Sequence, residues 1–323
     1  MSGRDVLKAV WSHLKEYPGF WLEVYAAIYV ALSIFQLITL LSIGSIQESL
    51  FSGFPNDFPA FDLQSFLGYY FAYIFGYMLI GLMTFTLSVE ATGFVERGEG
   101  TPKLIDLAKQ GISKYPRILG ITLILTGPLI VLYILGFASM FRNMQTLFGA
   151  QSGTDIQTGF NPVVPFMPCG ITIIMIPVAA WALFSCQAAV LENKGVVQAL
   201  KTGIAFLRNN LSSIVRLALW LILVLITIAI VQSLAMAPFS IAVMIPAQRE
   251  MMECMNATDT PEALMQCLQQ VQQGSTTGVL QTITALLSSV GTALQSLVMV
   301  MSTTILFFRR NVAPTEITIA DEI

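Results

Sequence analysis

The chain has 323 residues, of which 55% are hydrophobic and 11% charged, and its mean hydropathy is +0.73. Soluble globular domains carry about 25% charged residues, so this composition excludes a soluble fold and indicates an integral membrane protein. The formal net charge of −3 is too small to suggest a nucleic acid as partner.

Six apolar stretches along the chain are each long enough for the roughly 20 residues that cross a hydrocarbon core about 30 Å thick. They comprise residues 19–43, 67–95, 118–141, 168–191, 212–240 and 278–308. The sequence therefore predicts an all-α fold, a polytopic membrane bundle of six transmembrane helices.

The positive charges are distributed unequally among the segments that connect these stretches. When alternate segments are assigned to alternate sides, fourteen of the 16 Lys and Arg residues fall on the side of the termini, and only Arg142 and Arg249 fall on the other. Because cytoplasmic segments carry the excess of Lys and Arg, we expect both termini in the cytoplasm and the protein in the plasma membrane.

Three similar segments each precede an apolar stretch: LKAVWSHLKEYPGF at 7–20, IDLAKQGISKYPRI at 105–118 and VQALKTGIAFLRNN at 197–210. The stretches that return to the same side end alike, in VERGEG, LENKGV and FFRRNV. A fixed period of this kind indicates internal repeats. We expect a single membrane domain, 1–323, built of three tandem helical-hairpin units. The units cover 1–98, 99–194 and 195–311, followed by a cytoplasmic tail at 312–323.

Each unit begins with an amphipathic segment that we expect to form an interfacial helix. In the second unit Thr101 is a suitable N-cap and Pro102 suits the first helical position. We expect the basic residues of these helices to face the anionic head groups of the bilayer, namely Lys103, Lys109, Lys114, Lys201 and Arg208. The helices either orient the following span or act as a regulatory lipid or protein switch.

Two features inside the membrane could carry function. Glu90 is the deepest acid, and carboxylates within a membrane often mark an ion or proton route; the alternatives are pairing with a basic residue of an interfacial helix, or access to water. The sixth span has a polar face formed by Gln281, Thr284, Ser288, Thr292, Gln295 and Ser296. The second span has small residues at every fourth position, Gly68, Ala72 and Gly76. This spacing favours close helix packing over a hydrated pathway.

The fifth loop, REMMECMNATDTPEALMQCLQQ, contains Cys254 and Cys267 on the expected outer side. Thr260 and Pro261 predict the start of a second short helix there. We expect an outer helical hairpin at 246–277 with a disulfide between Cys254 and Cys267, which suits an oxidising exterior.

The segment AVLENKGVVQALKTGIAFLRNN, residues 189–210, resembles an uncharacterised family of prokaryotic six-span membrane proteins. That family is similar to the membrane domain attached to some glycerophosphodiester phosphodiesterases. The resemblance implies a six-helix membrane module with interfacial helices and no assigned catalytic residues. The catalytic barrel of those enzymes has no counterpart in this sequence, so their hydrolytic activity is not expected.

No nucleophile, nucleotide or metalloprotease motif occurs in the sequence. The single histidine, His13, and four cysteines do not supply a set of metal ligands. We therefore expect no enzyme, cofactor or metal. The first hypothesis is a scaffold or assembly subunit that binds a protein partner or a second copy of itself. The alternative is a transporter or channel for a small solute or ion that uses Glu90 and the polar face of the sixth span.

The predicted topology can be tested by cysteine accessibility. In a variant without the native cysteines, a thiol introduced at Asp106 should react with a membrane-impermeant reagent only after the membrane is opened. A thiol at Asp259 should react in intact cells. Labelling in the opposite sense at either position would contradict the topology.

Overall fold

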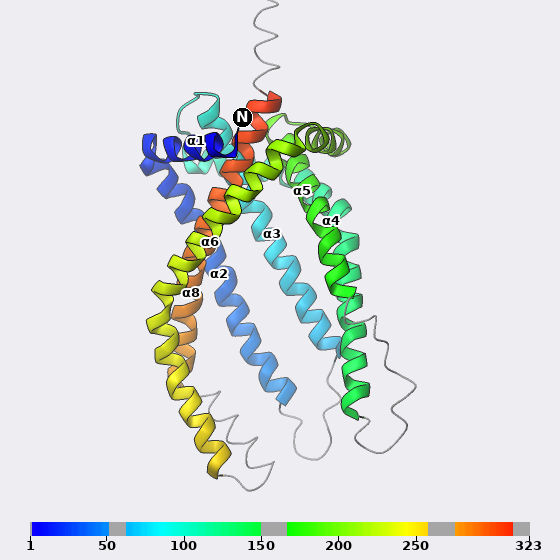
Figure 1. The fold of residues 1–323 in the computed structure, drawn as a ribbon, viewed down its shortest axis with the longest axis vertical. Helices are drawn as coiled ribbons and strands as arrows, with labels where there is room; N and C mark the ends of the chain where they lie inside the picture. Colours follow the sequence, from blue (N-terminus) through cyan, green and yellow to red (C-terminus); the bar gives the residue numbers. More distant parts are fainter. Residues whose placement is uncertain (1, 52–62, 150–166, 258–274, 313–323) are drawn as a thin grey trace, which may run out of the picture. The chain divides into compact units, whose positions relative to one another are not determined.

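The structure is a computed structural model that describes residues 2–51, 63–149, 167–257 and 275–312. All regular elements of these residues are helical, which confirms the all-α prediction (Figure 1). They are α1 (Gly3–Glu16), α2 (Pro18–Phe51), α3 (Leu63–Glu96), α4 (Leu104–Gly149), α5 (Met167–Leu191), α6 (Val196–Ala257), α8 (Ser275–Phe307) and the π-helix η4 (Phe308–Val312). Six of the helices, α2 to α6 and α8, are long and apolar enough to cross a membrane, as predicted.

Two of these helices are longer than a membrane requires. α4 has 46 residues and α6 has 62, which at 1.5 Å per residue corresponds to about 69 and about 93 Å. A hydrocarbon core of about 30 Å cannot contain either of them. Pro116 removes one hydrogen bond within α4, and Asn210 has non-helical angles (φ −119°, ψ 17°) within α6. We call residues 3–16, 104–115 and 196–209 the interfacial segments.

The chain divides into two compact units, each described by itself. Unit 1 comprises Met1–Phe20, Leu63–Leu217 and Val300–Ile323, and unit 2 comprises Trp21–Asp62 and Ala218–Met299. Unit 1 therefore contains all three interfacial segments, together with α3, α4, α5 and η4. Unit 1 also contains the last residues of α8, from Val300, and unit 2 contains nearly all of α2, α6 from Ala218 and α8 up to Met299.

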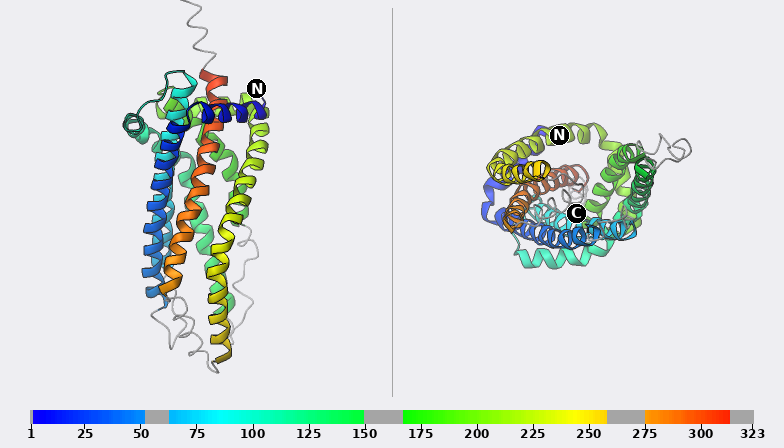
Figure 2. Two further views of the ribbon diagram at one scale, coloured as in Figure 1. Left: turned by 90° about the vertical axis from the view of Figure 1, so that its left-hand side faces the viewer. Right: turned by 90° about the horizontal axis from the view of Figure 1, so that it is seen from below.

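In unit 1, α3, α4 and α5 pack against one another, and α1 lies across the end of α3 instead of along it (Figure 2). A capping box begins α1: Asp5 N–H donates to the Ser2 hydroxyl, and the Asp5 carboxylate accepts from Ser2 N–H. Hydrogen bonds from Ser2 hold the pKa of Asp5 below its usual range. α1 buries Val6 and Val10, so one face of this amphipathic segment is packed against the protein.

Three aromatic rings hold the third interfacial segment in place. The ring of Phe206 lies 4.9 Å from that of Phe184 on α5 and 4.8 Å from that of Phe307 on α8, centroid to centroid. Both contacts are tilted, an arrangement that aromatic pairs favour. All three side chains are buried, so this cluster forms a hydrophobic core beneath the segment.

Two interfacial segments contact a span of unit 1 through a buried glycine. A Cβ at Gly111 would lie 3.4 Å from Thr86 Cγ2 on α3, and a Cβ at Gly203 would lie 2.7 Å from Ser185 N and 2.9 Å from Ser185 Cα on α5. At Gly203 the two backbones are too close for a residue with a Cβ atom to fit. Gly203 therefore lets a helix backbone reach a neighbouring backbone directly.

One predicted packing contact is wrong, and other expectations concern residues outside the described part of the chain. Close packing was predicted at Gly68, but a Cβ there would meet no described atom within 4 Å. α6 continues without a break to Ala257, so residues 246–257 belong to it. The rest of the expected outer hairpin, including Cys267, and the tail after residue 312 lie outside the described residues, as does the side chain of Cys254.

The close approach at Gly203 predicts a size limit. Gly203→Ala should lower the apparent melting temperature in detergent, because the added methyl group meets the backbone of α5. The expected loss of unfolding free energy is about 1–3 kcal/mol. Gly81→Ala, in the interior of α3 with no atom near its Cβ, should be neutral or slightly stabilising. Equal melting temperatures for the two variants would contradict the packing described here.

Candidate functional site

The carboxyl end of α5 is the most elaborately bonded part of unit 1. The last four carbonyls of an α-helix have no partner within the helix. α5 ends at Leu191, and Asn193 then adopts a left-handed conformation with φ of +52°, which Asn tolerates at helix ends. The carbonyls of this end therefore need donors from other elements.

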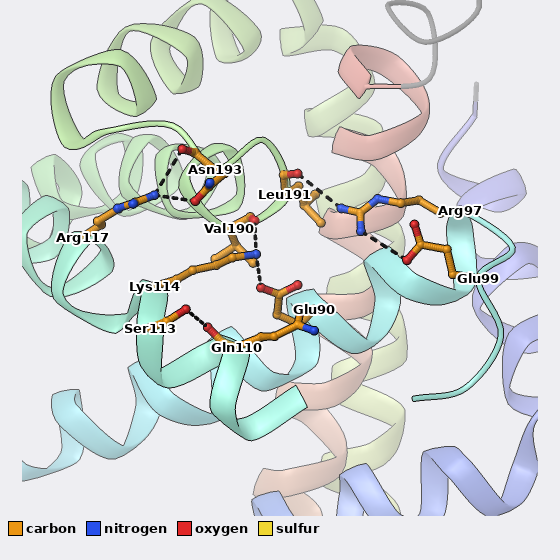
Figure 3. A network of polar contacts seen from close by, with 10 residues as sticks. All are labelled: Glu90, Arg97, Glu99, Gln110, Ser113, Lys114, Arg117, Val190, Leu191 and Asn193. Carbon is orange, nitrogen blue, oxygen red and sulfur yellow. Dashed lines mark hydrogen bonds and ion pairs between the residues drawn. The ribbon is translucent and has the colours of Figure 1, made fainter. Parts of the chain in front are cut away.

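Two cations from neighbouring elements donate to the last carbonyls of α5, and a third binds Asn193, just beyond the helix (Figure 3). The bonds are Lys114 Nζ to Val190 O at 2.8 Å, Arg97 Nη2 to Leu191 O at 3.3 Å, and Arg117 Nη1 to Asn193 O at 3.2 Å and to Asn193 Oδ1 at 2.6 Å. Cations at a helix carboxyl end also interact favourably with the helix dipole. We call Arg97, Lys114 and Arg117 the α5 cap.

Glu90 supplies the counter-charge of this cap. Its side chain on α3 is only 1% exposed and forms an ion pair with Lys114 Nζ, whose side chain is 18% exposed. A buried carboxylate is costly unless it is paired and hydrogen-bonded. Of the alternatives for Glu90, the structure contains the pairing with a basic residue of an interfacial segment. Through Lys114, the second interfacial segment is bonded to both α3 and α5.

The second polar junction of unit 1 is centred on Glu96, the last residue of α3. Its two oxygens accept hydrogen bonds from Arg309 Nε and Nη2, both at 2.8 Å, and Oε1 also lies 2.7 Å from His13 Nε2. Bidentate Arg–carboxylate pairs are the strong and geometrically specific ones. Glu96 thereby joins α1 and η4 to α3, and the only histidine of the chain has a positioning role there.

The third junction is centred on Glu192, directly after α5. Its carboxylate accepts a hydrogen bond from the amide of Asn311 on η4 and pairs with Lys194. Lys194 Nζ also donates to Thr202 Oγ1 at 3.0 Å, on the third interfacial segment. This junction links the end of α5 to η4 and to the segment that follows.

The sequence contained a signal for these two junctions that composition does not reveal. Glu96 and Glu192 occupy the same position in VERGEG and LENKGV, the similar ends of two returning spans. The sequence predicts no function for either glutamate, because a position at the end of a span is expected to be within reach of water. Their partners His13, Arg309 and Asn311 are distant in sequence, so the contacts depend on the tertiary fold.

Unit 2 contains a polar cluster within its apolar helices. Gln36 Oε1 on α2 accepts hydrogen bonds from the hydroxyls of Ser289 at 2.7 Å and Ser288 at 3.3 Å on α8. Gln232 Nε2 on α6 donates to Ser288 O at 3.1 Å. Thr292 Oγ1 bonds to the same carbonyl within its own helix. The predicted polar face of α8 is thus partly occupied by contacts between helices.

The remaining predicted residues have different environments. The side chain of Gln281 lies outside the described residues, and Gln295 is half-buried on α8. Glu90 belongs to unit 1, whereas Ser288, Thr292 and Gln295 belong to unit 2.

The basic residues of the interfacial segments fall into two groups. Lys103, Lys109, Lys201 and Arg208 are exposed. Lys114 does not belong with them: we expected it to face lipid, but it is bonded to Glu90 and to the carbonyl of Val190. Lys109 and Lys114 are five positions apart and so lie on different faces of the helix, but the sequence does not show which face the spans cover.

The described residues offer little for covalent or metal chemistry. They contain no group of three or more His, Cys, Asp or Glu side chains that could hold a metal ion. Cys186 is a buried free thiol on α5 whose sulfur lies 3.9 Å from Thr122 Oγ1, and buried structural cysteines are chemically inert. The site is therefore a set of ion pairs and helix caps at one end of unit 1.

Comparison of the chain with known proteins gives no match among protein families, curated proteins or solved structures.

The pairing of Glu90 with Lys114 can be tested by a double-mutant cycle. Lys114→Met should destabilise the protein by about 3–5 kcal/mol, because it leaves a buried carboxylate without its cation. Glu90→Gln should cost less, because Lys114 retains some access to water. The double variant Glu90→Gln/Lys114→Met should be more stable than Lys114→Met alone, with a coupling energy of at least about 1 kcal/mol.

The control for this cycle is Lys109→Met, at an exposed position of the same segment, which should change stability by no more than about 0.5 kcal/mol. Strictly additive effects of the substitutions at positions 90 and 114 would show that the two side chains do not interact.

Proposed function

We propose that the protein is a non-enzymatic integral membrane protein that acts as a scaffold or as the partner-binding subunit of an assembly. In this proposal it lies in the plasma membrane of a prokaryote with both termini in the cytoplasm. The end of unit 1 that carries the α5 cap and the Glu96 and Glu192 junctions then faces the cytoplasm. This placement accounts for the fourteen Lys and Arg residues on one side.

The environment of Glu90 carries the proposal. A carboxylate that carries protons or ions through a membrane must change its partners during each cycle, and it requires a water-filled or protein-lined route. Glu90 is instead buried against Lys114, and Lys114 is also a cap of α5. Releasing this pair would uncap a span. The carboxylate is best explained as a structural group that fixes the second interfacial segment.

Two of the three proposed hairpin units share a burial pattern in their interfacial segments. Leu107 and Gly111 are buried in the second interfacial segment, and Ala199 and Gly203, each 92 residues later, are buried in the third. In both segments the glycine lies against a span of the preceding hairpin repeat. A scaffold built of repeated units presents similar surfaces at regular intervals, as other repeat architectures do.

The alternative function is a transporter or channel for a small solute or ion. One observation favours it, namely the polar cluster of Gln36, Gln232, Ser288 and Ser289 within the apolar part of unit 2. Nearby on α2, the hydroxyl of Ser33 is buried without a hydrogen-bond partner among the described residues. Polar groups within spans either join helices or line a pathway.

Purified protein in sealed liposomes distinguishes the two functions. With a pH-sensitive dye inside and an imposed pH gradient and membrane potential, the scaffold proposal predicts a proton flux equal to that of protein-free liposomes. In native membranes the chain should migrate on a non-denaturing gel in an assembly larger than its own mass of 35.3 kDa with bound detergent.

The matched variants are Glu90→Gln and Gln36→Leu. A flux above the protein-free level that Glu90→Gln abolishes, in a variant that remains folded, would contradict the scaffold proposal. Loss of flux in Gln36→Leu alone would assign a transport pathway to unit 2 and leave Glu90 as a structural group.

A further inference from the structure

A lysine lies within an exposed apolar stripe on two of the interfacial segments. In the second segment Ile105 and Ile112 are 67% and 61% exposed, and the exposed Lys109 lies between them. These residues are four and three positions apart, so they share one face of the helix.

The third segment repeats this arrangement 92 residues later. Val197 and Ile204 are 65% and 48% exposed, and the exposed Lys201 lies between them. Arg208, seven residues after Lys201, extends the same face and is also exposed. We call the two sets, Ile105–Lys109–Ile112 and Val197–Lys201–Ile204, the exposed triads.

The first segment presents a related surface. Trp11 is 61% exposed, and Lys15 Nζ lies 5.2 Å from the centre of its indole ring. A cation above an aromatic ring is a favourable contact. Each interfacial segment thus combines a large exposed apolar side chain with a cation directly beside it.

The cations of the triads differ from four cations of unit 1 that are paired with carboxylates. Lys114, Lys194, Arg97 and Arg309 are all bound to carboxylates of the same unit. Within the described part of the chain, Lys109 and Lys201 form no ion pair and no hydrogen bond through their side chains. The fold has therefore used some cations internally and left those of the triads available.

We propose that the two exposed triads bind the head groups of anionic phospholipids. The aliphatic stem of each lysine lies beside the isoleucine or valine side chains at the level of the acyl chains, and its ammonium group reaches the lipid phosphate. Each triad is on a segment that leads directly into a span, Pro116 and Asn210 marking the ends of the segments. This places the triads at the boundary between water and hydrocarbon, where amphipathic helices with basic residues bind.

A lipid surface explains the triads better than a soluble acidic partner does. An acidic protein would match the cations. It would leave the apolar side chains beside them in water unless it also covered the apolar residues of both triads. A bilayer surface is continuous and covers both at once. This inference holds whether the protein is a scaffold or a transporter. With the orientation given under the proposed function, the lipids that the triads bind belong to the inner leaflet.

The test measures lipids retained by the purified full-length protein. The protein is reconstituted in vesicles of phosphatidylcholine and phosphatidylglycerol of known ratio and extracted with mild detergent, and the retained lipids are quantified by mass spectrometry. The wild type should retain phosphatidylglycerol enriched over the vesicle ratio. Lys109→Gln/Lys201→Gln should lose most of this enrichment, about fivefold per cation. Lys109→Arg/Lys201→Arg should keep it.

Arg4→Gln/Arg310→Gln is the matched control, since it removes two exposed cations of unit 1 that lie outside the triads. It should retain phosphatidylglycerol as the wild type does. Absence of enrichment in the wild type would overturn the proposal and favour a protein as the occupant of the triads. Equal losses in the control and the double variant would also overturn it, because they would show an effect of total charge.

Inorganic phosphate tests whether the triads bind a lipid or a soluble anion. Added at constant ionic strength, it should leave the retained phosphatidylglycerol unchanged. Displacement of the lipid by phosphate, but not by chloride, would assign the triads to a soluble anion and overturn the lipid proposal.

Discussion

The carboxyl end of α5 is the constraint on which unit 1 depends. A helix that ends inside a packed bundle must find donors for its last carbonyls, and water has limited access to this end. The chain meets the need with the α5 cap, which takes one cation from the residue after α3 and two from α4. Because these cations follow α3 or belong to α4, their bonds to the end of α5 fix the positions of α3, α4 and α5 relative to one another.

The Glu96 and Glu192 junctions extend the same solution to the other elements of unit 1. Glu96 joins α1 and η4 to α3, and Glu192 joins η4 to the end of α5. Partly buried charges of this kind gain from pairing but lose solvation, so their clearest consequence is a defined geometry. They hold the interfacial segments against the spans, while Lys109 and Lys201 remain exposed on the opposite faces.

The sequence was sufficient to predict the helical class, the number of spans and the interfacial segments, because these follow from apolar length and from periodicity. It also predicted that Glu90 could pair with a basic residue nearby. It could not show that Lys114 is that residue, since it does not reveal which face of the second interfacial segment the spans cover. For Glu96 and Glu192 the sequence shows only that they occupy the same position in two similar span ends. Their roles could not be predicted, because the tertiary fold brings their partners His13, Arg309 and Asn311 to them.

The central claim is that Lys114 holds the carboxyl end of α5, and amide hydrogen exchange in reconstituted membranes tests it most directly. In the wild type, peptides that cover residues 186–194 should exchange slowly. Loss of a charge-assisted hydrogen bond at the helix end should raise their exchange rate about tenfold in Lys114→Met, and Lys109→Met should match the wild type. Equal exchange of this segment in all three proteins would contradict the account.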